Sequence, residues 1–206
     1  MKKIRVTIWN EFRHEKTEED VKALYPDGIH AFIKNNFAVD APDFDVTLAS
    51  LDDDECGLPD NVLENTDVLM WWGHMFHNEV PNELVEKIAD RVFRFGMGFI
   101  AMHSAHVSKP FQRIVGANGY LSWGEEQQEL IWNVMPSHPI ASGIPEHFEL
   151  EMEEMYGEPQ ENKGNKSDGP PAENGGEQRE YGKEADNGSS LRSEADTGLV
   201  HALILA

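Results

Sequence analysis

Apolar residues along the first two thirds of the chain gather into short runs that predict five strands. Residues 4–9 alternate apolar and polar side chains, which is the pattern of a strand. Residues 44–51 predict a second strand, and residues 67–73 and 98–104 are nearly continuous apolar runs. Continuous runs of this length are typical of strands that are buried on both faces of a parallel sheet. Residues 127–135 predict a fifth strand.

Helical periodicity fills the gaps between these strands. Apolar residues recur at helical spacing over residues 81–95, where Pro81 lies near the start of the predicted helix and Gly96 ends it. Residues 107–116 predict a shorter helix, and residues 17–37 predict helical structure interrupted by a Pro-Asp-Gly turn. Because strands and helices alternate with short connections, the sequence predicts a doubly wound, mostly parallel α/β sheet of the flavodoxin-like type. Such sheets bind ligands at the carboxyl ends of their strands.

The last quarter of the chain differs in composition. Residues 158–197 contain one Tyr, one Leu and three Ala as their only hydrophobic residues. So few apolar side chains cannot offset the entropy lost on ordering, which predicts disorder. The sequence therefore predicts an α/β domain over residues 1–157 and a polar, disordered tail over residues 158–206. The terminal "GLVHALILA" is apolar, and it either docks on the domain or forms an isolated apolar end.

Charge and length narrow the class of protein. A chain of 206 residues is long enough for one domain with a full hydrophobic core. Its net charge of -21 argues against a nucleic acid or an anionic membrane as partner and favours neutral or cationic small molecules. No apolar run approaches the roughly 20 residues of a membrane span, and the N-terminal pattern is not that of a signal peptide, so we expect a cytoplasmic protein. The single cysteine, Cys56, excludes an intramolecular disulfide. A homo-oligomer is compatible with the sequence.

Histidines follow three of the predicted strands. His14 comes after the first, His74 and His77 after the third, and His103 and His106 after the fourth. Each of the two pairs has a spacing of three, which allows both rings to converge on one ion. Zinc takes three or four such ligands, so zinc or another divalent metal is a candidate cofactor. Two other interpretations stay open: loop residues that satisfy backbone groups, and hydrogen-bond donors to a substrate.

Ser104 stands between two of these histidines and is a candidate nucleophile. A serine nucleophile needs a base within hydrogen-bond reach and donors for an oxyanion. The G-x-S-x-G frame is absent, because Met102 and His106 occupy its glycine positions. The sequence therefore favours a Ser104 that shapes the turn or hydrogen-bonds a ligand over a covalent mechanism. Trp9 and Trp72 border the same loops and are either platforms for a sugar ring or ordinary core residues.

Four stretches together resemble one known family. They are "VTIWNEFRHEK", "TDVLMWWGHMFHNEVP", "GFIAMHSAHVSKPFQRIVG" and "PSHPIASGIPEHFELEMEEMYGE". They are similar to the trehalose-utilization (ThuA-like) family, over residues 3–158. The resemblance implies a class I glutamine-amidotransferase-like fold and a role in the metabolism of a sugar, trehalose or a related disaccharide. The turn where that fold carries its cysteine nucleophile is His103-Ser104-Ala105-His106 here, so glutamine hydrolysis is not expected.

The resemblance also implies further strands after "EEMYGE", where this chain has its polar tail, so we expect a sheet that lacks its C-terminal strands. The leading hypothesis is an enzyme acting on a small-molecule carbohydrate at a histidine-rich, metal-binding site. The alternative is a non-catalytic sugar-binding or regulatory module on the same fold, inactive through loss of the C-terminal segment. The candidate catalytic residues are His74, His103, Ser104 and His106; the candidate metal ligands are His74, His77, His103 and His106; and the candidate substrate-binding residues are Trp9, Glu11, His14 and Trp72.

Overall fold

The computed structural model describes residues 3–37, 43–157 and 202–205. The chain divides into two compact units, Met1–Tyr120 with Leu199–Ala206, and Leu121–Gly198. The predicted boundary at residue 157 and the predicted disorder of residues 158–197 stay predictions, because residues 158–201 lie outside the described part. No helix among the described residues is long and apolar enough to cross a membrane.

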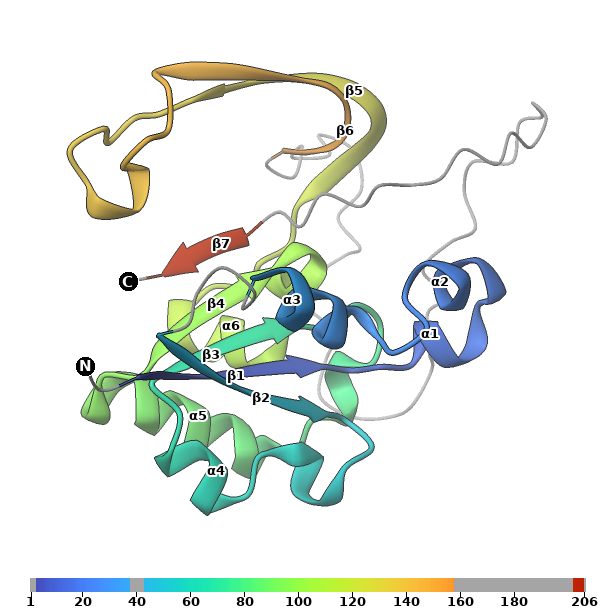
Figure 1. The fold of residues 1–206 in the computed structure, drawn as a ribbon, viewed down its shortest axis with the longest axis vertical. Helices are drawn as coiled ribbons and strands as arrows, with labels where there is room; N and C mark the ends of the chain where they lie inside the picture. Colours follow the sequence, from blue (N-terminus) through green and yellow to red (C-terminus); the bar gives the residue numbers. More distant parts are fainter. Residues whose placement is uncertain (1–2, 38–42, 158–201, 206) are drawn as a thin grey trace, which may run out of the picture. The chain divides into compact units, whose positions relative to one another are not determined.

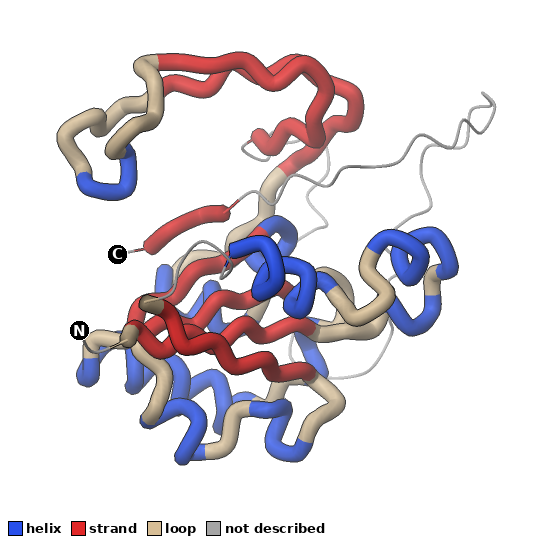
Figure 2. The backbone as a smooth tube through the Cα atoms, viewed as in Figure 1, coloured by secondary structure: helices blue, strands red, loops and turns tan. Residues whose placement is uncertain are grey.

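The first unit is built on a five-stranded sheet with the order β2-β1-β3-β4-β7 (Figures 1 and 2). Its first four strands run parallel and confirm the predicted α/β, flavodoxin-like class. Their bounds are β1 Ile4–Asn10, β2 Phe44–Ser50, β3 Val68–Trp72 and β4 Gly98–Met102. The chain runs from β1 outward to β2 and then returns to β3 on the other side of β1, so the switch point of the topology lies between β1 and β3.

The apolar C-terminal end docks on this sheet. Strand β7, Ala202–Leu205, pairs antiparallel with β4, with Ala101 opposite Leu203. Of the two outcomes that the sequence left open for these residues, the structure shows the docked one.

Helices cover both faces of the sheet in the first unit (Figure 1). One face packs its central side chains, Trp9, Trp71 and Phe99, with residues of α4, α5 and α6. The other face packs Ile8 and Met102 with residues of α3. Thus β3 and β4 are apolar on both sides, which explains their nearly continuous hydrophobic runs. Strand β1 alternates instead, and it buries the polar Thr7. The helix bounds are α1 His14–Thr17, α2 Glu19–Leu24, α3 Ile29–Phe37, α4 Asp60–Glu64, α5 Asn82–Phe95 and α6 Lys109–Val115, with short 3-10 turns at Asp54–Gly57, His77–Glu79, His103–Val107 and Pro139–Ala141.

Local sequence fixes the two helices that flank the site strands. Helix α5 starts after Pro81 and ends at Gly96, whose left-handed φ of 72° closes the helix as the glycine predicts. Helix α6 begins at Ser108, whose hydroxyl accepts a hydrogen bond from the Phe111 N–H. Helix α1 was not predicted, because its four residues are too few to show a helical period.

The second unit differs from the sequence expectation. Its fifth strand, β5 (Ser122–Trp132), does not join the main sheet but pairs antiparallel with β6 (His147–Gly157) in a two-stranded sheet. We call this pair the β5–β6 ribbon. Its strands place glutamates between their apolar residues, so neither strand has the uninterrupted apolar run that a central position in a parallel sheet requires.

Candidate functional site at the carboxyl edge of the sheet

Parallel register brings three strand ends level at one edge of the sheet. Asn10, Trp72 and Met102 are the last residues of β1, β3 and β4, and they are register partners across the three strands. The chain therefore leaves the sheet toward the same edge at all three points. The rings of His14 and His74 have centroids 4.5 Å apart, and those of His74 and His103 are 6.3 Å apart. The predicted gathering of these histidines at one edge is confirmed.

Ser104 lies at the centre of this group. Its Oγ is 2.9 Å from Nδ1 of His74 and 3.2 Å from Nδ1 of His103, and the hydroxyl donates a hydrogen bond to the carbonyl oxygen of Gly73 at 3.0 Å. One hydroxyl therefore bridges the loop after β3 and the turn after β4. The serine is half-buried, as are both histidines. The arrangement is a serine with two imidazole neighbours at hydrogen-bond distance.

His103 has an unusual backbone conformation. It follows the last residue of β4 directly and has a φ of 49°, in the left-handed region. This region is unfavourable for residues with a β-carbon, and such residues concentrate at functional sites. A sharp turn after a buried strand lifts the side chains of His103 and Ser104 onto the edge of the sheet, in the manner of a nucleophile elbow.

The surroundings of His74 keep its ring neutral. Burial, together with the neighbouring rings of His14, His103 and His77 as like charges, lowers the pKa of His74 to about 4. At neutral pH the imidazole therefore carries no charge and has a lone pair available. It also stacks on Trp72, with centroids 5.9 Å apart. A neutral imidazole beside a hydroxyl has the composition of a general base and its proton donor.

Glu11 holds the loop that carries His74. Its side chain is buried, and its carboxylate accepts hydrogen bonds from the backbone N–H groups of His74, Met75 and Phe76, at 2.8 to 3.1 Å. The structure thus places Glu11, a predicted substrate-binding residue, under the loop, where it accepts hydrogen bonds from three backbone N–H groups. In this conformation Glu11 positions His74, and its oxygens are directed at the protein.

His77 and His106, the other two histidines of these loops, have partly buried side chains as well. The pKa of His77 is lowered to about 4 by burial and, to a smaller extent, by nearby His106 as a like charge, against an opposing effect of the His74 backbone. Both ring nitrogens of His77 are buried without a hydrogen-bond partner among the described residues. The Nδ1 atom of His106 lies 2.5 Å from the carbonyl oxygen of Gly119, which ties the turn after β4 to the segment beyond α6.

Of the two predicted tryptophan platforms, neither offers a free face. Trp9 is 1% exposed, stacks on Trp71 at 3.7 Å, and donates its indole N–H to the carbonyl oxygen of Cys56. Trp72 is 8% exposed and lies under the ring of His74. The core interpretation therefore describes Trp9, and Trp72 supports a ring that is itself nearer the solvent.

Sequence reasoning missed a buried polar group behind the site. Asn10, Glu15 and His30 are all buried; the Asn10 amide donates to Glu15 at 2.7 Å and lies 3.2 Å from Nδ1 of His30. Glu15 also accepts the N–H of Ile29 at the start of α3. These contacts fix helix α1, and with it His14, against the sheet. The sequence signal for them was weak, because Glu15 belongs to a charged segment typical of an exposed loop.

The described residues do not form a metal centre. No group of three His, Cys, Asp or Glu side chains within the described ranges is placed to hold an ion. Zinc takes at least three such ligands. The predicted metal site therefore has no support among the described side chains and stays a prediction.

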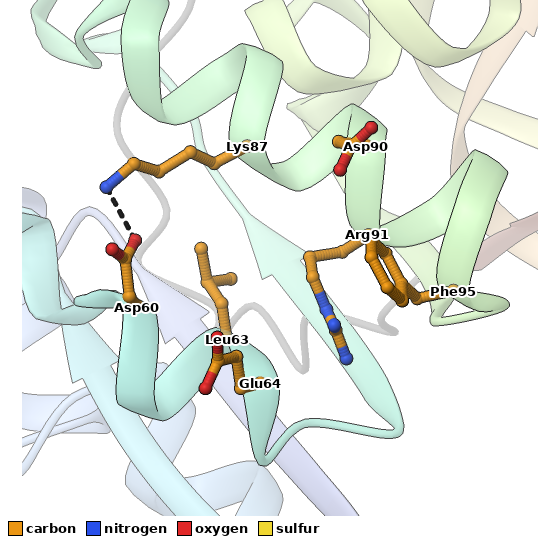
Figure 3. Close-up of a pocket in the computed structure, with 7 residues that line it drawn as sticks. All are labelled: Asp60, Leu63, Glu64, Lys87, Asp90, Arg91 and Phe95. Atoms are coloured by element: carbon orange, nitrogen blue, oxygen red, sulfur yellow. Dashed lines mark hydrogen bonds and ion pairs between the residues drawn. The ribbon is translucent and has the colours of Figure 1, made fainter.

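A groove of about 270 Å³ lies away from these residues, between α4 and α5 (Figure 3). An ion pair of 2.6 Å between Lys87 and Asp60 spans it, and the Arg91 guanidinium packs on the ring of Phe95. The groove contains none of the predicted site residues. We therefore place the candidate site at the histidine edge, where the titratable groups converge.

The fold and the edge site define the class of protein. A parallel flavodoxin-like sheet with a strained turn after β4 is consistent with the class I glutamine-amidotransferase-like superfamily. The sequence model of the ThuA family, described as trehalose utilisation, matches residues 5–167. The chain belongs to this family, and membership supports a role in trehalose utilisation. A comparison with curated proteins found no match.

Proposed function

We propose that the protein is an enzyme acting on a carbohydrate, trehalose or a related disaccharide, through acid–base chemistry at the carboxyl edge of its sheet. The observation that carries this proposal is the position of Ser104 Oγ, 2.9 Å from Nδ1 of His74 and 3.2 Å from Nδ1 of His103. Family membership supplies the substrate class. The site supplies the reaction type, because imidazole and hydroxyl groups transfer protons to and from the oxygen atoms of a sugar.

The electrostatics of the edge suit a neutral polyol. His74 is neutral at pH 7, so its Nδ1 or Nε2 accepts a proton from a substrate hydroxyl when the other nitrogen carries the ring proton. His14 and His103 flank it and provide further N–H donors or acceptors. A net charge of -21 places no penalty on an uncharged sugar but disfavours sugar phosphates.

Metal ions are not required by this proposal. Among the described residues no group of three His, Cys, Asp or Glu side chains is placed to hold an ion, and the proposal uses only groups that are placed. We therefore assign the proton transfers to His74, with Ser104 and His103 as its hydrogen-bonded neighbours.

The test measures binding and conversion separately. Trehalose is titrated into the protein by calorimetry and then incubated with it, and the sugar is followed by NMR. We expect wild-type protein to bind and convert the sugar, and His74→Gln to bind it with conversion at least about 100-fold slower, as for loss of a general base. The control is His147→Gln, an exposed histidine of the β5–β6 ribbon, which should leave both unchanged.

The same measurement discriminates the rival function. Binding without conversion by the wild type would make the protein a sugar-binding module on this fold. Absence of both, tested across related disaccharides, would overturn the carbohydrate proposal.

A further inference from the structure

We propose that Ser104 is a catalytic nucleophile activated by His74, and that the site cleaves an ester bond in an acylated sugar. This inference rests on the proposed function for a carbohydrate as its substrate class, and it adds a second reaction at the same site: acyl transfer from a sugar ester to water. It stands on geometry that the sequence did not reveal. The base comes from the loop after β3, thirty residues away from the serine, rather than from a neighbouring histidine.

Ser104 and His74 make the contact that a serine nucleophile needs with its base. The Oγ–Nδ1 distance of 2.9 Å lies within the range for a nucleophile hydrogen-bonded to its base. The Ser104 hydroxyl also donates to the Gly73 carbonyl oxygen at 3.0 Å, so its proton must turn to Nδ1 of His74 when the serine attacks. The tautomer of His74 with its proton on Nε2 leaves Nδ1 free to take the serine proton.

The backbone presents the serine for attack. His103, with its φ of 49°, turns the chain sharply at the end of β4, and Ser104 follows within a 3-10 turn. The two loops are fixed: Glu11 holds His74 through the backbone of residues 74–76, and the packing of the His14 ring at 4.5 Å restrains the imidazole. Positioning of this kind lowers the entropic cost of reaching the reactive geometry.

The reaction balances without a cofactor. Ser104 Oγ attacks the ester carbonyl carbon while Nδ1 of His74 takes its proton, and the carbonyl oxygen becomes an oxyanion. The C–O bond to the sugar then breaks, and the imidazolium returns the proton to the departing sugar hydroxyl. Water repeats the sequence on the acyl-serine, which releases the carboxylic acid and restores the hydroxyl. Nδ1 of His103 lies 3.2 Å from Oγ, and in the tautomer that carries the proton on this atom we assign it as a donor to the oxyanion.

The experiment measures covalent labelling of the serine rather than turnover of a sugar. A fluorophosphonate reacts with activated serines by displacement of fluoride, and peptide mass spectrometry identifies the labelled residue. We expect stoichiometric labelling of Ser104 in the wild-type chain, loss in Ser104→Ala, and labelling at least about 100-fold slower in His74→Gln. The matched control is Ser142→Ala, which removes an exposed serine of the second unit and should leave labelling unchanged. Melting curves establish that each variant is folded.

The pH profile separates this mechanism from a merely accessible serine. Because the pKa of His74 lies near 4, the labelling rate should hold from pH 8 to pH 5 and fall only below that. The groups that face His74 are the rings of His14, His103 and His77 and the carboxylate of Glu11. No label on Ser104 in the folded wild type, or equal labelling rates in the wild type and His74→Gln, would overturn the nucleophile. Either result would leave the trehalose measurement to decide the proposed function independently.

Discussion

His103 combines a strained backbone with a side chain at the centre of the site. A residue with a β-carbon pays about 1–2 kcal/mol to adopt the left-handed conformation, so a histidine here is tolerated against its intrinsic preference. Strain of this kind persists only where surrounding structure enforces it. Here the buried strand β4 and the hydrogen bonds of Ser104 provide that enforcement.

The strain predicts opposite effects for two substitutions at this position. His103→Gly should raise the unfolding free energy or leave it unchanged, because relief of about 1 kcal/mol of strain offsets the lost ring contacts. His103→Val should lower it by about 2 kcal/mol or more, because a β-branched residue is least compatible with this φ. Urea denaturation of both variants measures the difference. Equal stabilities would show that the turn is not strained.

Two buried histidines predict a loss of stability in weak acid. The pKa values of His74 and His77 lie near 4 in the folded chain, against about 6.5 in the unfolded chain. Between these values the unfolded state binds protons that the folded state does not, so the unfolding free energy must fall as the pH falls from about 6.5 to about 4. Each histidine contributes on the order of 3 kcal/mol over this window.

The measurement is urea denaturation at pH 7.5, 6.0 and 5.0. His74→Gln should flatten the decline over this range, and the exposed control His147→Gln should leave its slope unchanged. A stability that does not change between pH 7.5 and 5.0 would contradict the burial of these two rings.

At the scale of elements, sequence patterns predicted what depends on neighbours along the chain. Strand β1 leaves an alternating pattern in the sequence, and β3 and β4 leave continuous apolar runs because both of their faces are buried. Helix α5 leaves the helical period of its one apolar face. The common edge of the histidines followed from parallel topology alone.

The features that the sequence did not predict depend on contacts between residues that are far apart in the chain. The partner of Ser104 is a histidine thirty residues earlier, and no local spacing indicates which of five histidines it will be. The buried role of Glu15 depends on Asn10 and on the start of α3. Likewise β5 was recognised as a strand, but its partner, β6, could not be chosen from its own alternation.

The C-terminal strand β7 gives a prediction of its own at this scale. In an antiparallel ladder the backbone groups of successive residues point to opposite sides, so only one of two neighbouring residues bonds to β4. Proline removes the N–H donor. Of Leu203→Pro and Ile204→Pro, one should therefore lower the melting temperature clearly more than the other, since both residues pair with β4.

Melting curves of the two proline variants test this directly. In a protein of this size, each kcal/mol corresponds to roughly 2–4 °C. The more disruptive variant should also self-associate with increasing concentration, because an uncovered edge of β4 offers free backbone groups to another chain. Identical melting temperatures for both variants and the wild type would show that β7 does not pair with β4 in solution.

At the scale of the whole molecule, charge and exposed aromatic surface are unevenly distributed. Residues 121–157 contain no lysine or arginine. Their glutamates are Glu125, Glu126, Glu129, Glu146, Glu149, Glu151, Glu153 and Glu154. All of these glutamates except Glu146 lie on the β5–β6 ribbon, together with Trp123 and Trp132, which are 57% and 55% exposed. A two-stranded sheet without a covered face gains little stability from burial.

This distribution predicts two populations of tryptophan with different access to ionic quenchers. Trp9, Trp71 and Trp72 are buried at the sheet and should resist acrylamide, caesium and iodide alike. The two ribbon tryptophans should be quenched by acrylamide, and more strongly by caesium than by iodide, because the surrounding carboxylates attract a cation and repel an anion. The difference should shrink in high salt. Replacing both ribbon tryptophans with phenylalanine should leave a protected, charge-insensitive emission, whereas an unchanged quenching pattern in that variant would show that the quenched tryptophans lie in the sheet unit instead.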